Sequence, residues 1–582
     1  MRPWRGTAVT AVVGAAALLL SACGGGGEGG EGGSATDTGA YADCAANPNN
    51  CAAVPADQVQ QGGQLSFAIE KNIPNWNVLS SEGNVLETGI VSKAFLPYAF
   101  VSSPDLKMNL NTDLMVSADQ TTPTTLVYKI KPEAAWDDGT PISAADFAYN
   151  WKVQNPTQCP DCGNAGNGGY DSISNVTGSD NGKTVTVTLA KPYTDWRAFF
   201  SSGAPLYPAH IAAKHGDLNT PAGLASSFDW LGKNVPTYTG GPYKVANWQD
   251  NVALTFVPNP KWYGATKPKL DQLIFRVITD ATQEPIALQN NEVQVIYPQP
   301  QVDIVSQLRQ IPNASQSQGL GLSWEHFDMN LKNPFLKDKA LRQALFTAVN
   351  RQDVIAKTVG QFNPEVKPLN SLMFVPGQEG YQDNLGTSPV GSGDIERAKQ
   401  ILTQAGYTGV GTALVAPNKQ AVPALRIRYT VGNAVRQNQC ELFAQYAKQL
   451  GVNVTVQPTD DLGTTLTSGD YDVMNFAWVF TPFPFQNAQQ TFLSTSGSNY
   501  GKYTNPKTDQ IINEAAASTD VAAATAKLQE ADKIILDDAY ELPLYQKPTL
   551  IAAQDTVANV RNNSTLDGPS YNVSEWGLKA GS

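Results

Sequence analysis

Alternating apolar and polar positions predict short strands at several points along the chain. The segment 64–69 reads QLSFAI and alternates, and a loop around Pro74 ends it. The same period of two recurs at 126–131, 183–189, 252–257 and 273–278. A turn, Asp180-Asn181-Gly182, precedes the second of these segments and favours a hairpin there. We therefore expect sheet structure throughout the first half of the chain.

The second half shows the spacing of three and four that predicts amphipathic helices. This spacing covers 338–359, 395–405, 434–450 and 522–537. Gly406 and Gly451 end two of these helices, and a strand at 452–456 follows the third at once. In the first half, Ser143 and Asp146 form a capping-box variant that begins a helix. The strand-like segment 542–551 follows the last helix, so the pattern is that of an α/β protein.

A short apolar run at 8–22, between Arg5 and Cys23, is typical of an export signal and too short to span a bilayer. Its end, Leu20-Ser21-Ala22-Cys23, resembles the lipobox of bacterial lipoproteins. That resemblance implies an acyl anchor on Cys23 at the outer face of the cytoplasmic membrane. The alternative is an ordinary cleaved signal with an incidental cysteine. The Gly-rich stretch that follows predicts a flexible tether reaching to about residue 62.

The net charge bears on the possible binding partners, and the cysteines bear on the presence of disulfides. The formal net charge of -12 leaves no basic patch, which argues against a nucleic-acid partner. In an exported chain, the close pairs Cys44/Cys51 and Cys159/Cys162 predict two short-loop disulfides. A joint zinc site of four thiolates is the alternative. Cys440 lies among the apolar positions of a predicted helix, where a buried inert thiol is expected.

Signatures of catalysis are missing from the sequence. The chain has only three histidines, none in an H-E-x-x-H pattern, and it has no G-x-S-x-G elbow. Gly182-Lys183-Thr184 imitates the end of a phosphate loop, but Thr177 stands where the first glycine belongs. We therefore predict no enzyme activity, no catalytic residue, no metal site and no cofactor. A hydrolase with two facing carboxylates is kept as an alternative of another class.

One long motif carries a resemblance to a known family. Residues 126–130 form a strand, and residues 136–147 read WDDGTPISAADF, a turn followed by a capped helix. This order is similar to a signature of the peptide-type extracellular solute-binding proteins of ABC transporters (dipeptide and oligopeptide binding, family 5). Further matches follow in the family's order at 239–243, 259–263, 275–280, 327–330, 341–351, 398–407, 469–472 and 542–545.

The resemblance implies an α/β, two-lobed periplasmic-binding-protein fold with an extra domain inserted in lobe 1 and a hinge of two crossovers. The implied crossovers lie near 324–330 and 542–551. The implied divisions are 1–22 for the signal peptide, 23–62 for the tether, 79–233 for the inserted domain, 324–545 for lobe 2, and 63–78, 234–323 and 546–582 for lobe 1.

The resemblance also suggests which residues line the ligand cleft. Trp478 matches the family's cleft tryptophan, and Phe480 and Phe483 follow it; the alternative for such aromatics is a place in the core. Many relatives have an aspartate three residues after that tryptophan, where this chain has Thr481. A hydroxyl cannot neutralise the buried α-amino group of a peptide. Glu82, which matches another cleft acid, either compensates or faces solvent, and the predicted set is completed by Asn84 and Trp76.

The implied function is a lipid-anchored, monomeric receptor that captures a peptide or peptide-like solute. It would close around the solute and deliver it to the permease subunits of an ABC importer. Because Thr481 replaces an acid, a non-peptide solute is an alternative. A sensory receptor of the same fold and an extracytoplasmic hydrolase are the others.

Overall fold

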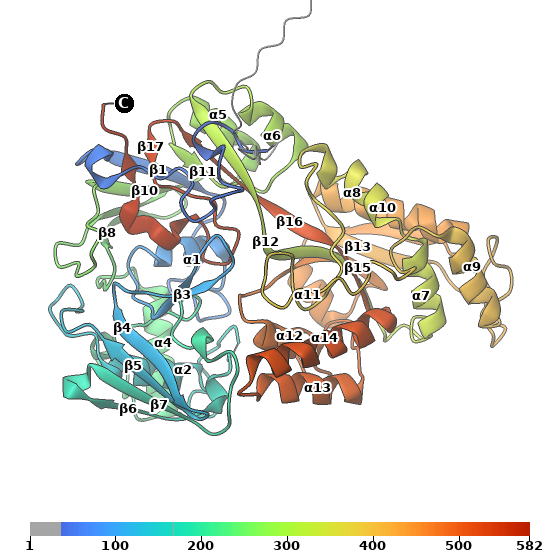
Figure 1. The fold of residues 1–582 in the computed structure, drawn as a ribbon, viewed down its shortest axis with the longest axis horizontal. Coiled ribbons are helices and arrows are strands. Elements are labelled where there is room, and N and C mark those ends of the chain that lie inside the picture. The colour runs from blue at the N-terminus through green and yellow to red at the C-terminus, as the bar shows by residue number, and fades with distance from the viewer. Residues whose placement is uncertain (1–35, 167, 582) are drawn as a thin grey trace, which may run out of the picture. The chain divides into compact units, whose positions relative to one another are not determined.

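One mixed sheet runs through the folded chain. The computed structural model describes residues 36–166 and 168–581. In this part, ten strands pair in the order β14-β13-β15-β12-β16-β11-β1-β10-β9-β8 (Figure 1). Their bounds are β1 Gln64–Ile69, β8 Tyr243–Gln249, β9 Ala253–Pro258, β10 Gln272–Val277, β11 Val295–Ile296, β12 Ala314–Met329, β13 Leu425–Thr430, β14 Val454–Thr459, β15 Val473–Val479 and β16 Glu541–Gln554.

Two long strands, β12 and β16, connect the two halves of this sheet. They are antiparallel to each other, with Ala314 opposite Gln554 at one end and Asp328 opposite Glu541 at the other. Toward one end β16 also pairs with β11, and toward the other β12 pairs with β15. The register of the β12–β16 pair shifts between Leu320 and Trp324. Continuous strands thus join the halves, and the ladder is interrupted between them.

A smaller sheet belongs to the segment before residue 234. Its order is β4-β5-β7-β6, with β4 Met115–Thr122, β5 Thr125–Ile130, β6 Ile173–Ser179 and β7 Thr184–Leu189. Helix α2 (Ala144–Gln154) packs on β6, and its capping box has both reciprocal bonds, as the sequence predicted. The remaining elements here are β2 Phe100–Ser102, β3 Met108–Leu110, α1 Leu86–Ser92, α3 Ala209–Ala212 and α4 Pro221–Lys233.

Helices surround the β13–β15 half of the large sheet. They are α7 Lys339–Ala348, α8 Arg351–Lys357, α9 Ile395–Gln404, α10 Ala434–Gln449, α11 Leu462–Ser468, α12 Pro484–Phe492, α13 Pro506–Ala516 and α14 Val521–Asp537. The single helix predicted over 338–359 is wrong, because Val349 adopts an extended conformation and Asn350 caps a new helix. Two short helices, α5 Glu284–Gln289 and α6 Val302–Leu308, and the strands β17 Val557–Ala558 and β18 Gly577–Leu578 complete the fold.

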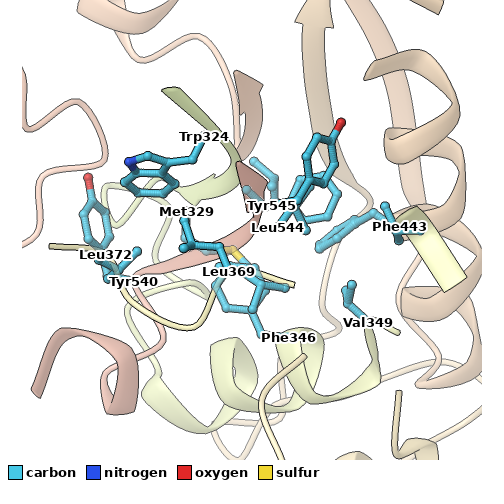
Figure 2. Packing of buried hydrophobic residues seen from close by; sticks show 14 of the residues in the cluster. Trp324, Met329, Phe346, Val349, Leu369, Leu372, Phe443, Tyr540, Leu544 and Tyr545 are labelled. Carbon is cyan, nitrogen blue, oxygen red and sulfur yellow. The ribbon is translucent and has the colours of Figure 1, made fainter. Parts of the chain in front are cut away.

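The folded chain contains two large hydrophobic cores. One is built mainly from residues before 296 and after 551 and includes Phe67, Tyr128 and Trp576. The other lies around β12, β15 and β16, where Trp324, Phe346, Phe443 and Tyr545 pack together (Figure 2). Separate cores on the two halves of one sheet are what a two-lobed α/β fold requires.

Residues 36–62 differ from the flexible tether that the sequence suggested. The Tyr41 side chain is 2% exposed and its hydroxyl donates to the Val560 carbonyl oxygen. Disulfides join Cys44 to Cys51 and Cys159 to Cys162, so these thiolates are not available for a zinc site. An aromatic anchor and a closed loop therefore attach this segment to the body.

The Cys23 prediction lies outside the described residues. None of the helices within 36–166 and 168–581 has the length and apolar character to cross a membrane.

Candidate functional site

A cavity of about 1460 Å³ is lined by segments that lie far apart in the sequence. One part of its wall comes from residues 78–108, 154–204 and 564–567, and another from residues 462–517. Residues 297–300 and 547–550, near the crossing strands, complete the lining. The volume exceeds the several hundred Å³ typical of small-molecule pockets. The cavity can therefore enclose an elongated solute.

Aromatic side chains from the end of β15 form one wall. Trp478 is half-buried and stacks on Tyr500, with ring centroids 5.9 Å apart and planes 10° from parallel. Phe476 meets the same indole edge-on at 4.9 Å. Phe480 and Phe483 also border the cavity, although each is only 5–6% exposed. This wall offers flat apolar surfaces that accept side chains of different shapes.

Thr481 lines the cavity, but its polar groups bond to the protein. Its hydroxyl donates to Asn487 Oδ1 at 2.9 Å, and the Asn487 amide donates to the Thr481 carbonyl oxygen at 2.8 Å. Asn487 lies in helix α12 and is 4% exposed. The pair fixes the loop between β15 and α12. No carboxylate stands at this position to receive an ammonium group.

The charged groups on the rest of the lining are three lysines and two aspartates, namely Lys93, Lys191, Lys547, Asp171 and Asp567. Lys93 Nζ is 3.3 Å from a carboxylate oxygen of Asp567 and donates to the Ser202 carbonyl oxygen at 2.9 Å, so this cation is compensated. Lys191 and Lys547 border the cavity elsewhere. Burial lowers the pKa of Lys547, whose ammonium donates to the Gln299 side chain. The lining thus offers cations for anionic groups of a solute.

Of the remaining predicted site residues, the structure places one at the cavity and two away from it. Asn84 borders the cavity, whereas Trp76 and Glu82 are not part of its lining. Trp76 is 4% exposed and packs edge-on against Trp248 at 5.5 Å. Glu82 is exposed and accepts from the Asn75 side-chain amide at 3.1 Å. Tyr500 and Lys547, in contrast, line the cavity without having been predicted, because no spacing links them to Trp478.

A buried polar cluster lies against Trp478. The indole N–H donates to Glu541 Oε2 at 3.2 Å, and the imidazole of His326 stacks parallel to the indole at 5.6 Å. Asp328 is two residues after His326 on β12 and directly opposite Glu541 on β16. Burial raises the pKa of both Asp328 and Glu541, and the Asp328 charge raises that of Glu541 further. Burial lowers the pKa of His326 and keeps its imidazole neutral.

Contacts beside the cavity join the segment at residue 194 to helices α12 and α13. The Thr194 N–H donates to the Ala516 carbonyl oxygen at 3.0 Å, and the Thr194 hydroxyl lies within donating distance of the carbonyl oxygens of Ala515 (2.9 Å) and Ser518 (2.8 Å). The Gln486 N–H at the start of α12 donates to Asp195 Oδ2 at 2.8 Å. Burial raises the pKa of Asp195 to about 7, although hydrogen bonds from the α12 backbone lower it. These bonds connect the two walls of the cavity.

Comparisons with known proteins agree with this geometry. The family model described as bacterial extracellular solute-binding proteins, family 5 Middle, matches residues 108–500. The chain is 31% identical over 520 residues to the oligopeptide-binding protein OppA of Mycobacterium bovis, covering 86% of this chain and 83% of OppA.

Solved structures share the fold. A periplasmic EDTA-binding protein, EppA, is 37% identical, with a TM-score of 0.85 over 90% of this chain and 97% of EppA. The oligopeptide-binding protein AppA of Bacillus subtilis, solved with a nonapeptide, is 21% identical, with a TM-score of 0.73 over 89% of this chain and 99% of AppA. The α/β, two-lobed fold expected from the sequence is confirmed. The chain belongs to the bacterial extracellular solute-binding proteins of family 5.

Proposed function

We propose that this protein captures a peptide in its cavity and delivers it to the permease subunits of an ABC importer. The observation that carries the proposal is the cavity of about 1460 Å³, with its aromatic wall, between segments that hinged closure can bring together. Trp478, Phe480, Thr481, Phe483 and Asn84 are the proposed ligand contacts. The relatives OppA and AppA, named as oligopeptide-binding proteins, support a peptide as the solute.

The proposed working parts follow the sequence divisions. Lobe 1 comprises 63–78, 234–323 and 546–582, the inserted domain 79–233, and lobe 2 comprises 324–545. Strands β12 and β16 act as the hinge, and the bonds of Thr194 and Asp195 hold the closed form. Because nothing in this mechanism breaks a covalent bond, we expect peptides to be recovered unchanged by mass spectrometry. Release of cleaved products would favour the hydrolase alternative.

We further propose that the protein acts as a monomer at the outer face of the cytoplasmic membrane, held by an acyl chain on Cys23. Two observations support this: the LSAC segment and the Gly-rich stretch behind it. Substituting Cys23→Ser is expected to move the protein from the membrane fraction to the soluble exported fraction. If the variant stays with the membrane, the anchor is wrong, and the capture function is unaffected.

Peptide capture is tested by thermal stabilisation of the full chain against a peptide library, followed by calorimetric titration of each hit. Replacing Trp478 with alanine should weaken binding at least about tenfold, as expected for a central aromatic contact. The matched control is Trp230→Ala, because Trp230 stacks on His215 at 3.6 Å, outside the cavity lining. No stabilisation by any peptide, or equal losses in both variants, would contradict the proposal.

A second candidate is a carboxylate-rich, non-peptide solute. Two observations favour it. The Thr481 hydroxyl is already bonded to Asn487 and provides no charge for a peptide α-amino group, and Lys191 and Lys547 in the lining provide cations for carboxylates. The relative EppA, named as EDTA-binding, points the same way. The stabilisation assay therefore includes EDTA and its metal complexes beside the peptides. A shift with these and none with peptides would select the second candidate.

A further inference from the structure

We propose that His326, Asp328 and Glu541 form a binding site for one divalent transition-metal ion, with Zn²⁺ as the best-suited ion. Each of these residues offers a ligand atom, and these atoms lie within 4.8 Å of one another. The sequence analysis predicted no metal site. The site is separate from the solute cavity and does not depend on which solute the cavity takes.

The strand pairing explains why these three side chains meet. His326 and Asp328 are two residues apart on β12, so their side chains leave the same face of the sheet. Glu541 stands directly opposite Asp328 on β16. A central ion at about 2.0–2.2 Å from each ligand keeps ligand atoms at most about 4.4 Å apart. The observed upper limit of 4.8 Å is close to this value.

The second observation is that the cluster is buried and, in the described part of the chain, most of its polar atoms lack a partner of hydrogen-bond geometry, although the Tyr540 hydroxyl acts on the pKa of Asp328 and nearby backbone groups act on that of His326. His326, Asp328 and Glu541 are all 0% exposed. Within the described residues, neither ring nitrogen of His326 and neither carboxylate oxygen of Asp328 reaches a partner with hydrogen-bond geometry. The carboxylate of Glu541 accepts only from the Trp478 indole, at 3.2 and 3.4 Å. Buried polar groups of this kind are rare in native proteins, and a bound ion is one of their explanations.

The chemistry of the donor set selects the kind of ion. Two adjacent buried carboxylates repel each other when ionised, and a dication neutralises both charges at once. One imidazole nitrogen with two carboxylates suits Zn²⁺, whereas Mg²⁺ prefers an all-oxygen shell and keeps several waters. The buried Tyr471 hydroxyl also has no partner, and the charges of Asp328 and Glu541 act on it.

An occupied site would act on the cavity wall. The ion would hold Glu541, which accepts from the Trp478 indole, and His326, which stacks on the same ring. Two of the proposed metal ligands, Glu541 and His326, would thus fix the Trp478 side chain on the side away from the cavity. The ion serves as a structural support for the wall.

The test measures zinc bound to the full chain. Because the site is buried, the protein is refolded with its disulfides intact in the presence of ZnCl₂, passed over a weak chelating resin, and analysed by mass spectrometry for metals. We expect about one zinc ion per chain for the unaltered protein. His326→Gln and Glu541→Gln should each retain at least about tenfold less. Glu541→Gln keeps an oxygen acceptor for the Trp478 indole, so its fold should be maintained.

The matched control is His210→Gln, because His210 is a partly exposed imidazole paired with Asp138 at 2.9 Å. This variant should bind as much zinc as the unaltered protein. Circular dichroism checks the fold of every variant, and anomalous diffraction at the zinc edge should place the ion between the three side chains. Absence of zinc from the refolded protein would overturn the proposal. Equal zinc in the His326 and Glu541 variants, or loss only in the His210 variant, would also overturn it.

Discussion

Trp478 combines two roles that usually fall to different residues. One side of its indole borders the cavity, and the other contacts His326 and Glu541. An amphipathic ring of this kind gives a large apolar contact while its N–H bonds to a fixed partner. The orientation of this side chain is therefore set by the protein before a solute arrives, which lowers the entropy cost of binding.

The buried carboxyl of Asp195 should make solute affinity depend on pH. Burial against α12 raises its pKa from 3.8 to about 7 even though the α12 backbone hydrogen bonds lower it, so burial of this carboxyl favours the protonated form. The stabilisation is full below pH 3.8 and is lost as the pH rises through about 7. If closure buries Asp195 fully, affinity for a peptide without acidic or histidine side chains should fall by up to about a hundredfold between pH 5 and pH 8.

The control for this pH dependence is Asp195→Asn, which keeps an acceptor for the Gln486 N–H but does not titrate. Calorimetric titrations across the same pH range should give a nearly constant affinity for this variant. If the variant shows the same pH dependence as the unaltered protein, another group is responsible.

At this scale, the sequence predicted the half of the site that is local. Phe480, Thr481 and Phe483 could be found because they follow Trp478 in one segment that resembles the family. Glu541 could not be associated with His326, because their proximity depends on the register between β12 and β16. Trp76 packs against Trp248 outside the cavity lining, in a loop after β1 where Asn75 Oδ1 accepts from the Asn77 N–H at 2.8 Å.

At the scale of elements, a buried ion pair joins helix α10 to strand β12. Arg436 bonds to Glu325 at 3.0 Å, and the side chains are 9% and 4% exposed. Removing one partner leaves an uncompensated buried charge, which costs about 3–5 kcal/mol. Arg436→Met should therefore lower the melting temperature on the order of 10 °C, measured by calorimetry.

The matched control is Arg426→Met on strand β13 of the same sheet. Arg426 bonds to Asp470 at 2.7 Å, but the two side chains are 39% and 56% exposed. An exposed pair contributes at most about 1 kcal/mol, so the melting temperature should change by only about 1–4 °C. Equal effects of the two substitutions would show that burial is not what gives the Glu325 pair its importance.

The break between α7 and α8 shows where sequence periodicity fails. Apolar spacing continues through Val349, but the Asn350 side chain accepts from the Asp353 N–H at 2.9 Å and begins a new helix. Asparagine competes with the helix in this way because its side chain can replace a backbone acceptor. The helices 395–405, 434–450 and 522–537 have no such interior cap and were predicted to within a residue or two of their observed ends.

Asn350→Ala should destabilise α8 by about 1 kcal/mol, because the cap is lost. Asn350→Asp keeps the acceptor and should be close to neutral. Urea denaturation followed by circular dichroism compares the two variants. Equal loss in both would mean that the side-chain amide, and not the capping oxygen, matters at this position.

At the scale of the whole molecule, the interrupted ladder between Leu320 and Trp324 is the place where the two halves can bend. Gly321 lies within it, and an added Cβ would stand 1.8 Å from the Ser564 carbonyl oxygen. Only a residue without a side chain allows this close approach. The crossing strand β12 is difficult to predict from sequence, because Gly319 and Gly321 lower its strand propensity.

Gly321→Ala should therefore shift the backbone at the crossing and weaken both stability and ligand affinity. Small-angle scattering with and without ligand measures whether compaction on binding is reduced. Gly463→Ala is the control, because this exposed residue of helix α11 lies outside the cavity lining and its added Cβ would meet only Asp461 Oδ1, at 3.6 Å. The control should be neutral or slightly stabilising. An unchanged response in the Gly321 variant would show that bending occurs elsewhere.

The direct pairing of Asp328 with Glu541 has a practical consequence. The chain leaves β12 just after Asp328 and returns in β16 at a neighbouring position, so the stretch between these points, which includes β13, β14 and β15 of the same sheet, has two adjacent covalent junctions. A chimaera that exchanges this stretch with a relative needs two splices, both within antiparallel pairing, and must also re-form the pairing of β15 with β12. Such a graft would transplant the aromatic wall as one piece, and with it the solute preference.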